Sequence, residues 1–386
     1  MPSNKIFNDP IYGFISVPSG ILMKIIEHPY FQRLRRIKQL GLTHYVYPGA
    51  VHTRFNHALG AYYLMTEAIH HLIQKGHLIS KEEIEAAQIA ILLHDIGHGP
   101  FSHVLENSLV NVQHETITLW MMESMNEEFD QELSLAIQLF KGQYHKKFLQ
   151  QLISSQLDVD RLDYLKRDSF YTGVVEGNIG IDRLIMMMDI KDNELVLEEK
   201  AIYTIEKFLS SRRIMYLQVY LHKTALVAEK MLKSLLEKVS KLSVPTLYGS
   251  NLLEFIQSEF NYSDVIDRQK FIQQFSNLDD VDIWNLLKQC RNHSDVEISK
   301  LATGLLDRKL FKIVISNHDS HIPIHPSLNS DRNLKDSNFK VEFSAYDPSE
   351  GEIMIKNKDG NVQALSSFSD LIYLMQNTSR YYSIIS

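Results

Sequence analysis

The feature that most constrains this fold is an apolar helix that runs into a group of histidines. Residues 86–93 read AAQIAILL, which predicts a buried helix, and residues 94–103 read HDIGHGPFSH. Ser80 and Glu83 form a capping-box pattern at the start of this helix, and we expect Gly99-Pro100 to end it. A buried helix that ends in imidazoles and a carboxylate indicates a site rather than a packed face alone.

Helical spacing of apolar residues dominates the first part of the chain. Besides the helix before the histidines, we predict helical segments over 21–40, with a break at His28-Pro29 and Gly41 as the stop, from Arg54 onward, over 114–140, over 145–172 and over about 199–239. Residues before about Gly20 are rich in turn formers. Two short apolar strands flank Lys191-Asp192-Asn193, and this pattern predicts a hairpin.

The pattern changes after a predicted linker at 244–250. Helical segments continue to about Lys309, and four strands are then predicted from the segments LFKIVIS, FKVEFSAY, EIMIKNK and VQALSS, with turns at 349–351 and 359–361. We therefore predict a mainly α protein with two domains. These are a helical core over 1–245 and a small α+β accessory or oligomerisation region over 246–386, in which no motif assigns chemistry.

Composition excludes several classes of protein. A net charge of −7 argues against a general nucleic-acid binder. The single cysteine, Cys290, excludes an intrachain disulfide and any metal site built from several cysteines, and it fits a reducing compartment. No signal-peptide pattern opens the chain, and no apolar run approaches the roughly 20 residues that cross a bilayer. We expect a cytoplasmic protein with no membrane partner.

Four residues form a candidate metal-ligand set: His57, His94, Asp95 and Asp160. Helical neighbours point about 100° apart, so His94 and Asp95 can share an ion only from a helix end or with ligands from elsewhere. Mixed imidazole and carboxylate sets suit Fe, Mn, Zn or Ni rather than Ca or Mg. Any one of these residues alone is more often a polar cap or a satisfied core residue. All four together favour a metal site.

Several motifs, in order, resemble the HD-domain metal-dependent phosphohydrolases. They are FNDPIYG, FQRLRRIKQLG, YPGAVHTRFNHALG, LLHDIGHGPFSH and DVDRLDYLKRDSFYTGV. The resemblance covers about residues 5–235 and is to the deoxynucleoside triphosphate triphosphohydrolase branch, which includes bacterial dGTPases and the vertebrate sterile-alpha-motif and HD-domain triphosphohydrolase. It implies an HD-domain core, a divalent transition metal at the HD site, possible Mg with the nucleotide, and hydrolysis to deoxynucleoside and inorganic triphosphate.

The resemblance also implies individual roles. His114 with Glu106 is similar to an acid/base pair in these enzymes, and His98 and His103 are similar to phosphate and sugar contacts. His103 and Glu106 lie on one side of a helical turn. Histidine suits these roles because it titrates near neutrality. The residues implied to bind substrate are the arginines Arg54, Arg161 and Arg212 at the triphosphate, Gln39, Tyr164 and Asp168 at the sugar, and Leu40 and Tyr220 as a wall against a 2′-hydroxyl. Arginine suits phosphate because its contacts can be bidentate.

In regulated relatives a further set of residues binds nucleotide activators between subunits. The matching residues here are Lys5, Ile6, Asn8, Glu27, Gln32, Arg35, His222 and Lys223. Glu27 stands where those relatives have Asp, so the base preference of such a site stays open. The basic run RLRRIK also reads as a solvated amphipathic helix. Relatives imply a homo-oligomer, a dimer or a tetramer, and two-fold symmetry is the commonest arrangement.

Two other functions are compatible with the sequence. The same site could act on another nucleotide or on a phosphomonoester. Alternatively, the chain could be a catalytically weak regulator that binds nucleotide or nucleic acid, and such a protein would be expected to lack a metal ligand. All four predicted ligands are present, which favours the enzyme.

Overall fold

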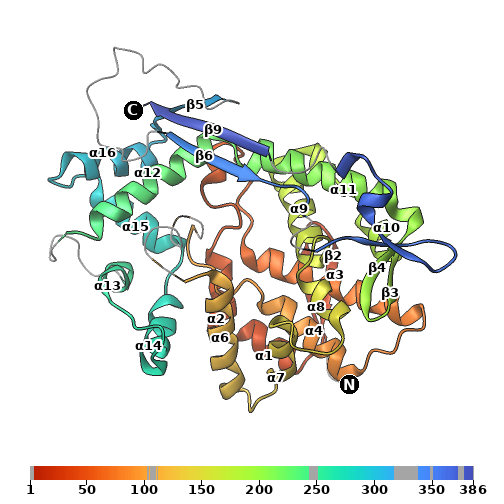
Figure 1. Ribbon diagram of the computed structural model, residues 1–386. Helices are drawn as coiled ribbons and strands as arrows, with labels where there is room; N and C mark the ends of the chain where they lie inside the picture. The colour runs from red at the N-terminus through yellow and green to blue at the C-terminus, as the bar shows by residue number, and fades with distance from the viewer. Residues whose placement is uncertain are drawn as a thin grey trace.

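The protein is mostly helical, as predicted (Figure 1). The computed structural model describes residues 4–101, 104, 110, 112–242, 251–316, 338–347, 351–372 and 378–385. The helices up to 242 are α1 (Ile21–Glu27), α2 (Pro29–Arg33), α3 (Arg54–Gln74), α4 (Lys81–Leu93), α6 (His114–Glu128), α7 (Ser134–Phe140), α8 (Lys147–Ile153), α9 (Val159–Thr172), α10 (Ile181–Met186), α11 (Ile202–Met215) and α12 (Lys223–Val239). Those after 250 are α13 (Asn251–Gln257), α14 (Val265–Phe275), α15 (Asp280–Cys290) and α16 (Val296–Leu306).

Short helical turns and three small sheets complete the described fold. The turns are η1 (Leu34–Arg36), η2 (Gly41–Tyr45), η3 (Val175–Gly177), η4 (Glu199–Ala201), the π-helical η5 (Tyr216–Tyr220) and η8 (Leu365–Ser367). The sheets are the hairpin β1 (Lys5–Asp9) and β2 (Gly13–Val17), a sheet of order β3 (Met188–Lys191), β4 (Glu194–Glu198), β7 (Met354–Lys356), β8 (Val362–Ala364), and a sheet of order β5 (Lys312–Ser316), β9 (Thr378–Ile385), β6 (Asn338–Phe343).

Helix α3 is the central element of the core. It is buried on most of its circumference and contacts both α4 and α9, as expected of a helix enclosed by other helices. At Gly60 the backbone of α3 approaches α9 so closely that a Cβ atom there would lie 2.0 Å from Asp163 Oδ1. This approach brings the first turns of α3 and α9, with His57 and Asp160, next to each other.

Local signals placed several boundaries correctly. Thr53 caps α3 in a capping box, and Ser80 and Glu83 form the predicted capping box of α4. The hairpin at Asp192-Asn193 is also confirmed: β3 pairs with β4 in antiparallel fashion, and both turn residues have positive φ. This backbone matches the tight hairpin turns that Asn and Asp tolerate.

Other predicted boundaries were wrong. The helix before the histidines ends at Leu93 with His94 as its C-cap, before Gly99-Pro100. The helix predicted over about 199–239 is interrupted: α11 passes into η5, and α12 begins after His222, whose Nδ1 accepts the backbone N–H of Thr224. A side-chain cap thus starts a new helix inside one apolar pattern.

Two strand regions were missed. The turn-rich N-terminal segment forms the hairpin β1–β2, whose reversal is held by Asp9 Oδ1 accepting the N–H groups of Ile11 and Tyr12. Strand β9 was not predicted, yet it is the middle strand of its sheet and pairs with both β5 and β6. The three-stranded sheet packs on α12 around Val227, Ile313 and Tyr382, as seen at the top of Figure 1.

The two predicted domains share one hydrophobic core. Leu64 of α3 and Leu286 of α15 belong to the same buried cluster, and β4 pairs in parallel with β7 from the C-terminal region. The boundary near 245 falls at 243–250, outside the described residues, and stays a prediction. Within the described ranges, no helix combines the length and apolar character needed to span a membrane.

Candidate metal centre and active site

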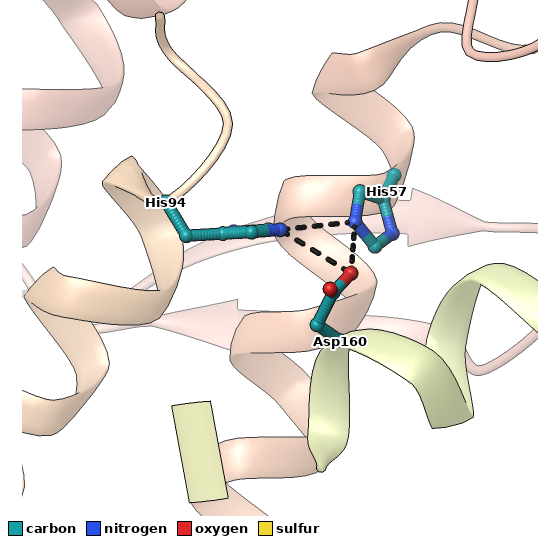
Figure 2. Close-up of side chains that lie close together, drawn as sticks. All are labelled: His57, His94 and Asp160. Atoms are coloured by element: carbon teal, nitrogen blue, oxygen red, sulfur yellow. Dashed lines mark hydrogen bonds and ion pairs between the residues drawn. The ribbon is translucent and has the colours of Figure 1, made fainter. Parts of the chain in front are cut away.

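Three predicted ligands converge on one point (Figure 2). His57 Nε2 lies 3.0 Å from Asp160 Oδ1 and 3.2 Å from His94 Nε2, and His94 Nε2 lies 3.4 Å from Asp160 Oδ1. His57 comes from the first turn of α3, His94 caps the C-terminus of α4, and Asp160 comes from the first turn of α9. Three helix ends therefore deliver one ligand each.

The second nitrogen of each imidazole is already engaged. His57 Nδ1 lies 2.7 Å from Asp163 Oδ2, and His94 Nδ1 lies 2.6 Å from the carbonyl oxygen of Ile91. Because carboxylate and carbonyl oxygens only accept, both Nδ1 atoms carry a proton, and both Nε2 atoms face the shared point, where a metal ion would replace any proton on them. Such outer partners fix the tautomer of metal-binding histidines.

The spacing of the three atoms fits a metal ion. Ligand atoms about 2.1 Å from a metal, with angles between about 90° and 110°, lie about 3.0–3.5 Å apart. Burial lowers the pKa of His57, but Asp160 and Asp163 raise it by more, to about 10. A site that stabilises a proton so strongly also favours a cation, and the imidazole and carboxylate donors suit a transition metal.

Asp95 adjoins this group. Its Oδ1 lies 3.4 Å from His94 Nε2, its Oδ2 lies 3.8 Å from His57 Nε2, and Oδ2 accepts a hydrogen bond from Arg54 Nη1 at 2.6 Å. The group of ligand atoms that all lie within 4.8 Å of one another comprises His57, His94 and Asp160. Asp95 as fourth ligand therefore stays a prediction, with the carboxylate held at the histidines by Arg54.

The candidate site coincides with a known domain. Residues 54–168 match the HD domain, and residues 179–253 match the HD associated region. The crystal structure of a phosphohydrolase from Bacteroides thetaiotaomicron is 47% identical with a TM-score of 0.93, and the match covers 100% of both chains. The chain belongs to the HD-domain phosphohydrolases.

Three further relatives of this phosphohydrolase share fewer identical residues with it. The uncharacterized protein YwfO of Bacillus subtilis is 28% identical, and the match covers 96% of this chain and 89% of the length of YwfO. The deoxynucleoside triphosphate triphosphohydrolase SAMHD1 of Gallus gallus is 30% identical over 61% of this chain, and that of Homo sapiens is 31% identical over 59%. The matches cover 45% and 43% of those two proteins, so the chain spans less than half of their length.

Two of the predicted catalytic histidines of the phosphohydrolase form a stacked pair. The rings of His98 and His114 are 3.9 Å apart with an interplanar angle of 18°, and His98 Nε2 lies 3.3 Å from Asp95 Oδ1. Gly97 allows this because a Cβ atom there would lie 2.2 Å from the carbonyl oxygen of His114. His103 and Glu106 lie outside the described residues, so the acid/base pair of Glu106 and His114 stays a prediction.

The residues predicted at the sugar form a connected group. Asp168 Oδ2 accepts from the Tyr220 hydroxyl at 2.8 Å, and the Tyr220 ring lies 6.2 Å from that of Tyr164. The Tyr164 ring is in turn 6.4 Å from His57. Gln39 is linked to this group through His52, because the Gln39 backbone N–H donates to the carbonyl oxygen of His52 at 3.0 Å and the His52 ring bonds Asp168. Leu40, which follows Gln39, is half-buried against the core.

The three predicted triphosphate arginines lie around this group. Arg54 bonds Asp95, Arg161 Nη1 lies 3.1 Å from Asp158 Oδ2, and Arg212 Nη1 donates to Gln156 at 3.4 Å. Burial raises the pKa of the Tyr164 hydroxyl and Tyr216 adds to the rise, whereas Arg212 and Arg161 lower it. Both guanidinium groups therefore lie close enough to Tyr164 to affect its hydroxyl electrostatically.

Two residues of the site were missed in the sequence. Asp163 orients His57 and also bonds Arg167, which bonds Asp9 of the N-terminal hairpin. His52 Nε2 donates to Asp168 Oδ1 at 2.7 Å, with its ring stacked on Tyr171. The i,i+4 spacing of Asp163 and Arg167 was an available signal, whereas no local pattern points from His52 to Asp168.

The predicted activator residues fall into two places. The Lys5 ammonium lies 3.8 Å from Glu27, and Arg35 donates to Gln32 and stacks at 3.5 Å over Phe55. The two other N-terminal members, Ile6 and Asn8, are exposed on the hairpin. The second place follows the π-helical turn η5, where His222 caps α12 and Lys223 is exposed. Binding of an activator by these residues stays a prediction, as does the oligomeric state.

Proposed function

We propose that this phosphohydrolase hydrolyses deoxynucleoside triphosphates to a deoxynucleoside and inorganic triphosphate. The observation that carries the proposal is the continuous path of contacts from the ligand cluster at His57 through Tyr164 and Tyr220 to Asp168. A path that joins a candidate metal site to hydroxyl and carboxylate groups offers partners for both the phosphates and the sugar of one nucleotide. The relatives named as deoxynucleoside triphosphate triphosphohydrolases support the same substrate class.

Different residues of the chain act on different parts of the substrate. When bound at His57, His94, Asp95 and Asp160, a divalent transition metal supplies polarisation of a phosphoryl oxygen and activation of water. Arg54, Arg161 and Arg212 bind the triphosphate, because a guanidinium matches phosphate oxygens in pairs. The stacked imidazoles of His98 and His114 are placed to hold or move a proton, since histidine changes its charge near neutrality.

The sugar end has unused hydrogen-bonding capacity. Gln39 Oε1 is buried and has no hydrogen-bond partner within the described part of the chain, and such an orphan acceptor is costly unless a ligand satisfies it. Asp168 accepts from His52 and Tyr220, but a carboxylate offers about four acceptor positions. A sugar 3′-hydroxyl can therefore donate to Asp168 or to Gln39 without breaking the existing contacts.

Product analysis tests the proposal. Each of the four deoxynucleoside triphosphates and the four ribonucleoside triphosphates is incubated with the purified protein and Mn²⁺, and the products are separated. We expect deoxynucleoside and triphosphate, with the ribonucleotides cleaved more slowly. Release of orthophosphate or pyrophosphate alone would contradict the proposed reaction. Cleavage of p-nitrophenyl phosphate but of no triphosphate would favour the phosphomonoester alternative.

The same assay addresses the third function considered above. A nucleotide-binding regulator would bind Mn²⁺ weakly or not at all and would cleave none of these compounds. Asp160→Ala serves as the control, because it removes one of the three convergent ligands. Any hydrolysis that persists in this variant comes from a contaminant rather than from the HD site.

A further inference from the structure

Arg33 is a buried arginine that contacts the turn carrying the HD residues. It is the last residue of α2 and is 0% exposed. Its Nη2 donates to the carbonyl oxygen of Ile96 at 3.4 Å and also to that of His98. Its Nε and Nη1 atoms are buried and have no hydrogen-bond partner within the described residues. The only hydrogen bonds of this guanidinium in that part of the chain therefore go to one backbone turn.

The same turn is also held by α6. The Gly97 N–H donates to Thr118 Oγ1 at 3.0 Å, and Thr118 Oγ1 donates to the carbonyl oxygen of His94 at 3.1 Å. A Cβ atom at position 97 would lie 2.4 Å from the Thr118 nitrogen, so the contact requires glycine. The turn that presents Asp95 and His98 is thus held by hydrogen bonds from both Thr118 and Arg33.

Burying Arg33 is energetically unfavourable. Burial lowers the pKa of its guanidinium to about 9, although nearby Asp279 raises it. No described carboxylate is hydrogen-bonded to Arg33, and its charged group stacks on the Phe275 ring of α14 at 5.0 Å. A buried charge without a hydrogen-bonded ionic partner costs free energy that an apolar side chain of similar size would avoid. Stability of the fold alone therefore does not account for an arginine here.

We propose that Arg33 is a positioning residue of the hydrolase, which holds the Asp95–His98 turn so that both side chains are preorganised at the metal cluster and at His114. The inference rests on the proposed role of Asp95 and His98 in the HD site. Phe275 covers the guanidinium and thereby makes the C-terminal region part of this support. Residues that orient metal ligands from outside typically contribute a factor of about 10–100 in metal affinity or activity.

Arg33→Met tests the proposal, because methionine keeps an apolar stem of similar length and removes the donors. We expect an unchanged or raised melting temperature, Mn²⁺ affinity lower by about 10–100-fold and kcat lower by a similar factor, with KM for the nucleotide nearly unchanged. Arg33→Lys should restore part of the loss, since one ammonium can still donate to a carbonyl. A lower melting temperature with wild-type Mn²⁺ affinity would overturn the proposal.

Two features of the experiment keep the result interpretable. Mn²⁺ affinity is measured by titration without nucleotide and referred to Asp160→Ala, so a wrong substrate assignment cannot be mistaken for a wrong role of Arg33. Arg36→Met is the matched control: Arg36 is half-exposed and bonds Asp279 of the C-terminal region rather than the turn, and its Mn²⁺ affinity should stay at the wild-type value. Should Arg33→Met not fold, Arg33→Lys decides, and wild-type Mn²⁺ affinity in that variant overturns the proposal.

Discussion

Single hydrogen bonds orient the chemically active atoms of this phosphohydrolase. His57 presents Nε2 to the ligand cluster because Asp163 accepts from Nδ1, and Asp163 is itself held by Arg167 at 2.9 Å. Asp168 is held in the same way by His52. The supporting residues are as deeply buried as the predicted ligands, so loss of a support should disturb the site nearly as much as loss of a ligand.

Asp163→Ala should affect both metal binding and stability. The imidazole of His57 loses its fixed tautomer, so Mn²⁺ affinity should fall by about 10–100-fold. Arg167 keeps only Asp9 as its carboxylate partner among the described residues, so the free energy of unfolding should fall by about 3–5 kcal/mol. Metal titration and urea unfolding measure the two effects. An unchanged metal affinity would show that Asp163 does not orient His57.

His52→Phe should act at the sugar end only. Phenylalanine can keep the stacking on Tyr171 but cannot donate to Asp168, so Tyr220 is the remaining side-chain donor to Asp168 among the described residues. We expect a higher KM for deoxynucleoside triphosphates, with Mn²⁺ affinity unchanged, and a loss of about 1–3 kcal/mol of stability from the unpaired carboxylate oxygen. Steady-state kinetics and thermal unfolding check this. A reduced Mn²⁺ affinity would place His52 in the metal site instead.

At the scale of elements, the site depends on the contact between α3 and α9. Gly60 lets the two helices meet where His57, Asp160 and Asp163 face each other, since any side chain at this position would overlap Asp163 and Arg167. Helix ends supply the predicted ligands, and helix packing brings those ends together. The geometry of the cluster is therefore sensitive to the separation of two helix backbones.

Gly60→Ala should push α9 away from α3. Its Cβ would lie 2.0 Å from Asp163 Oδ1 and 2.2 Å from Arg167 Nη2, and such overpacking typically costs about 1–3 kcal/mol. Mn²⁺ affinity should fall as well, because Asp163 moves. Gly180→Ala is the control: its Cβ would meet its nearest neighbour at 3.6 Å, and we expect both quantities to stay near their wild-type values. Equal behaviour of the two variants would refute the argument.

At the scale of the whole molecule, residues after 250 contact the helical part that carries the candidate site. Lys356 of β7 and His77, which follows α3, both bond Asp189 of β3, and Phe275 of α14 covers Arg33. The hydrophobic core is continuous across the predicted boundary. We infer that the region after 250 supports the HD core in addition to any part it has in assembly.

Stability in acid should report on this junction. Burial raises the pKa of Asp189, but hydrogen bonds from Lys356 and His77 lower it by more, to about 2. The folded pKa lies below the ordinary value, so the contribution is present above about pH 4 and is lost as the pH falls towards 2; it amounts to about 1–2 kcal/mol. Asp189→Asn should reduce stability at neutral pH and flatten its decline in acid.

Unfolding in denaturant at a series of pH values measures this effect. The matched control is Asp192→Asn in the exposed β3–β4 turn, where asparagine suits the positive φ of 51°. This control should keep the wild-type dependence on pH. A parallel decline in acid for wild type and Asp189→Asn would show that the junction contributes nothing to acid stability.

Local sequence determined the features whose partners are close in the chain. The capping box at Ser80 and the turn at Asp192-Asn193 need contacts over only a few residues, so their patterns were sufficient. Residue types suggested His57, His94 and Asp160 as members of a ligand set, and the resemblance of ordered motifs supported it, because the HD chemistry restricts residue types at those positions. The interruption at His222 was missed because an apolar period continues across it, and a cap is a weaker signal than the period.

Only the tertiary structure decided which distant residues support that set. Asp163 reaches His57 across 106 positions, His52 reaches Asp168 across 116, and Arg167 reaches Asp9 across 158. Strand β9 likewise depends on neighbours far away in the chain. Periodicity records which face of a helix is apolar, but it carries no information on which helix will meet that face. Packing of α3 against α9 supplies that information, and through it the geometry of the site.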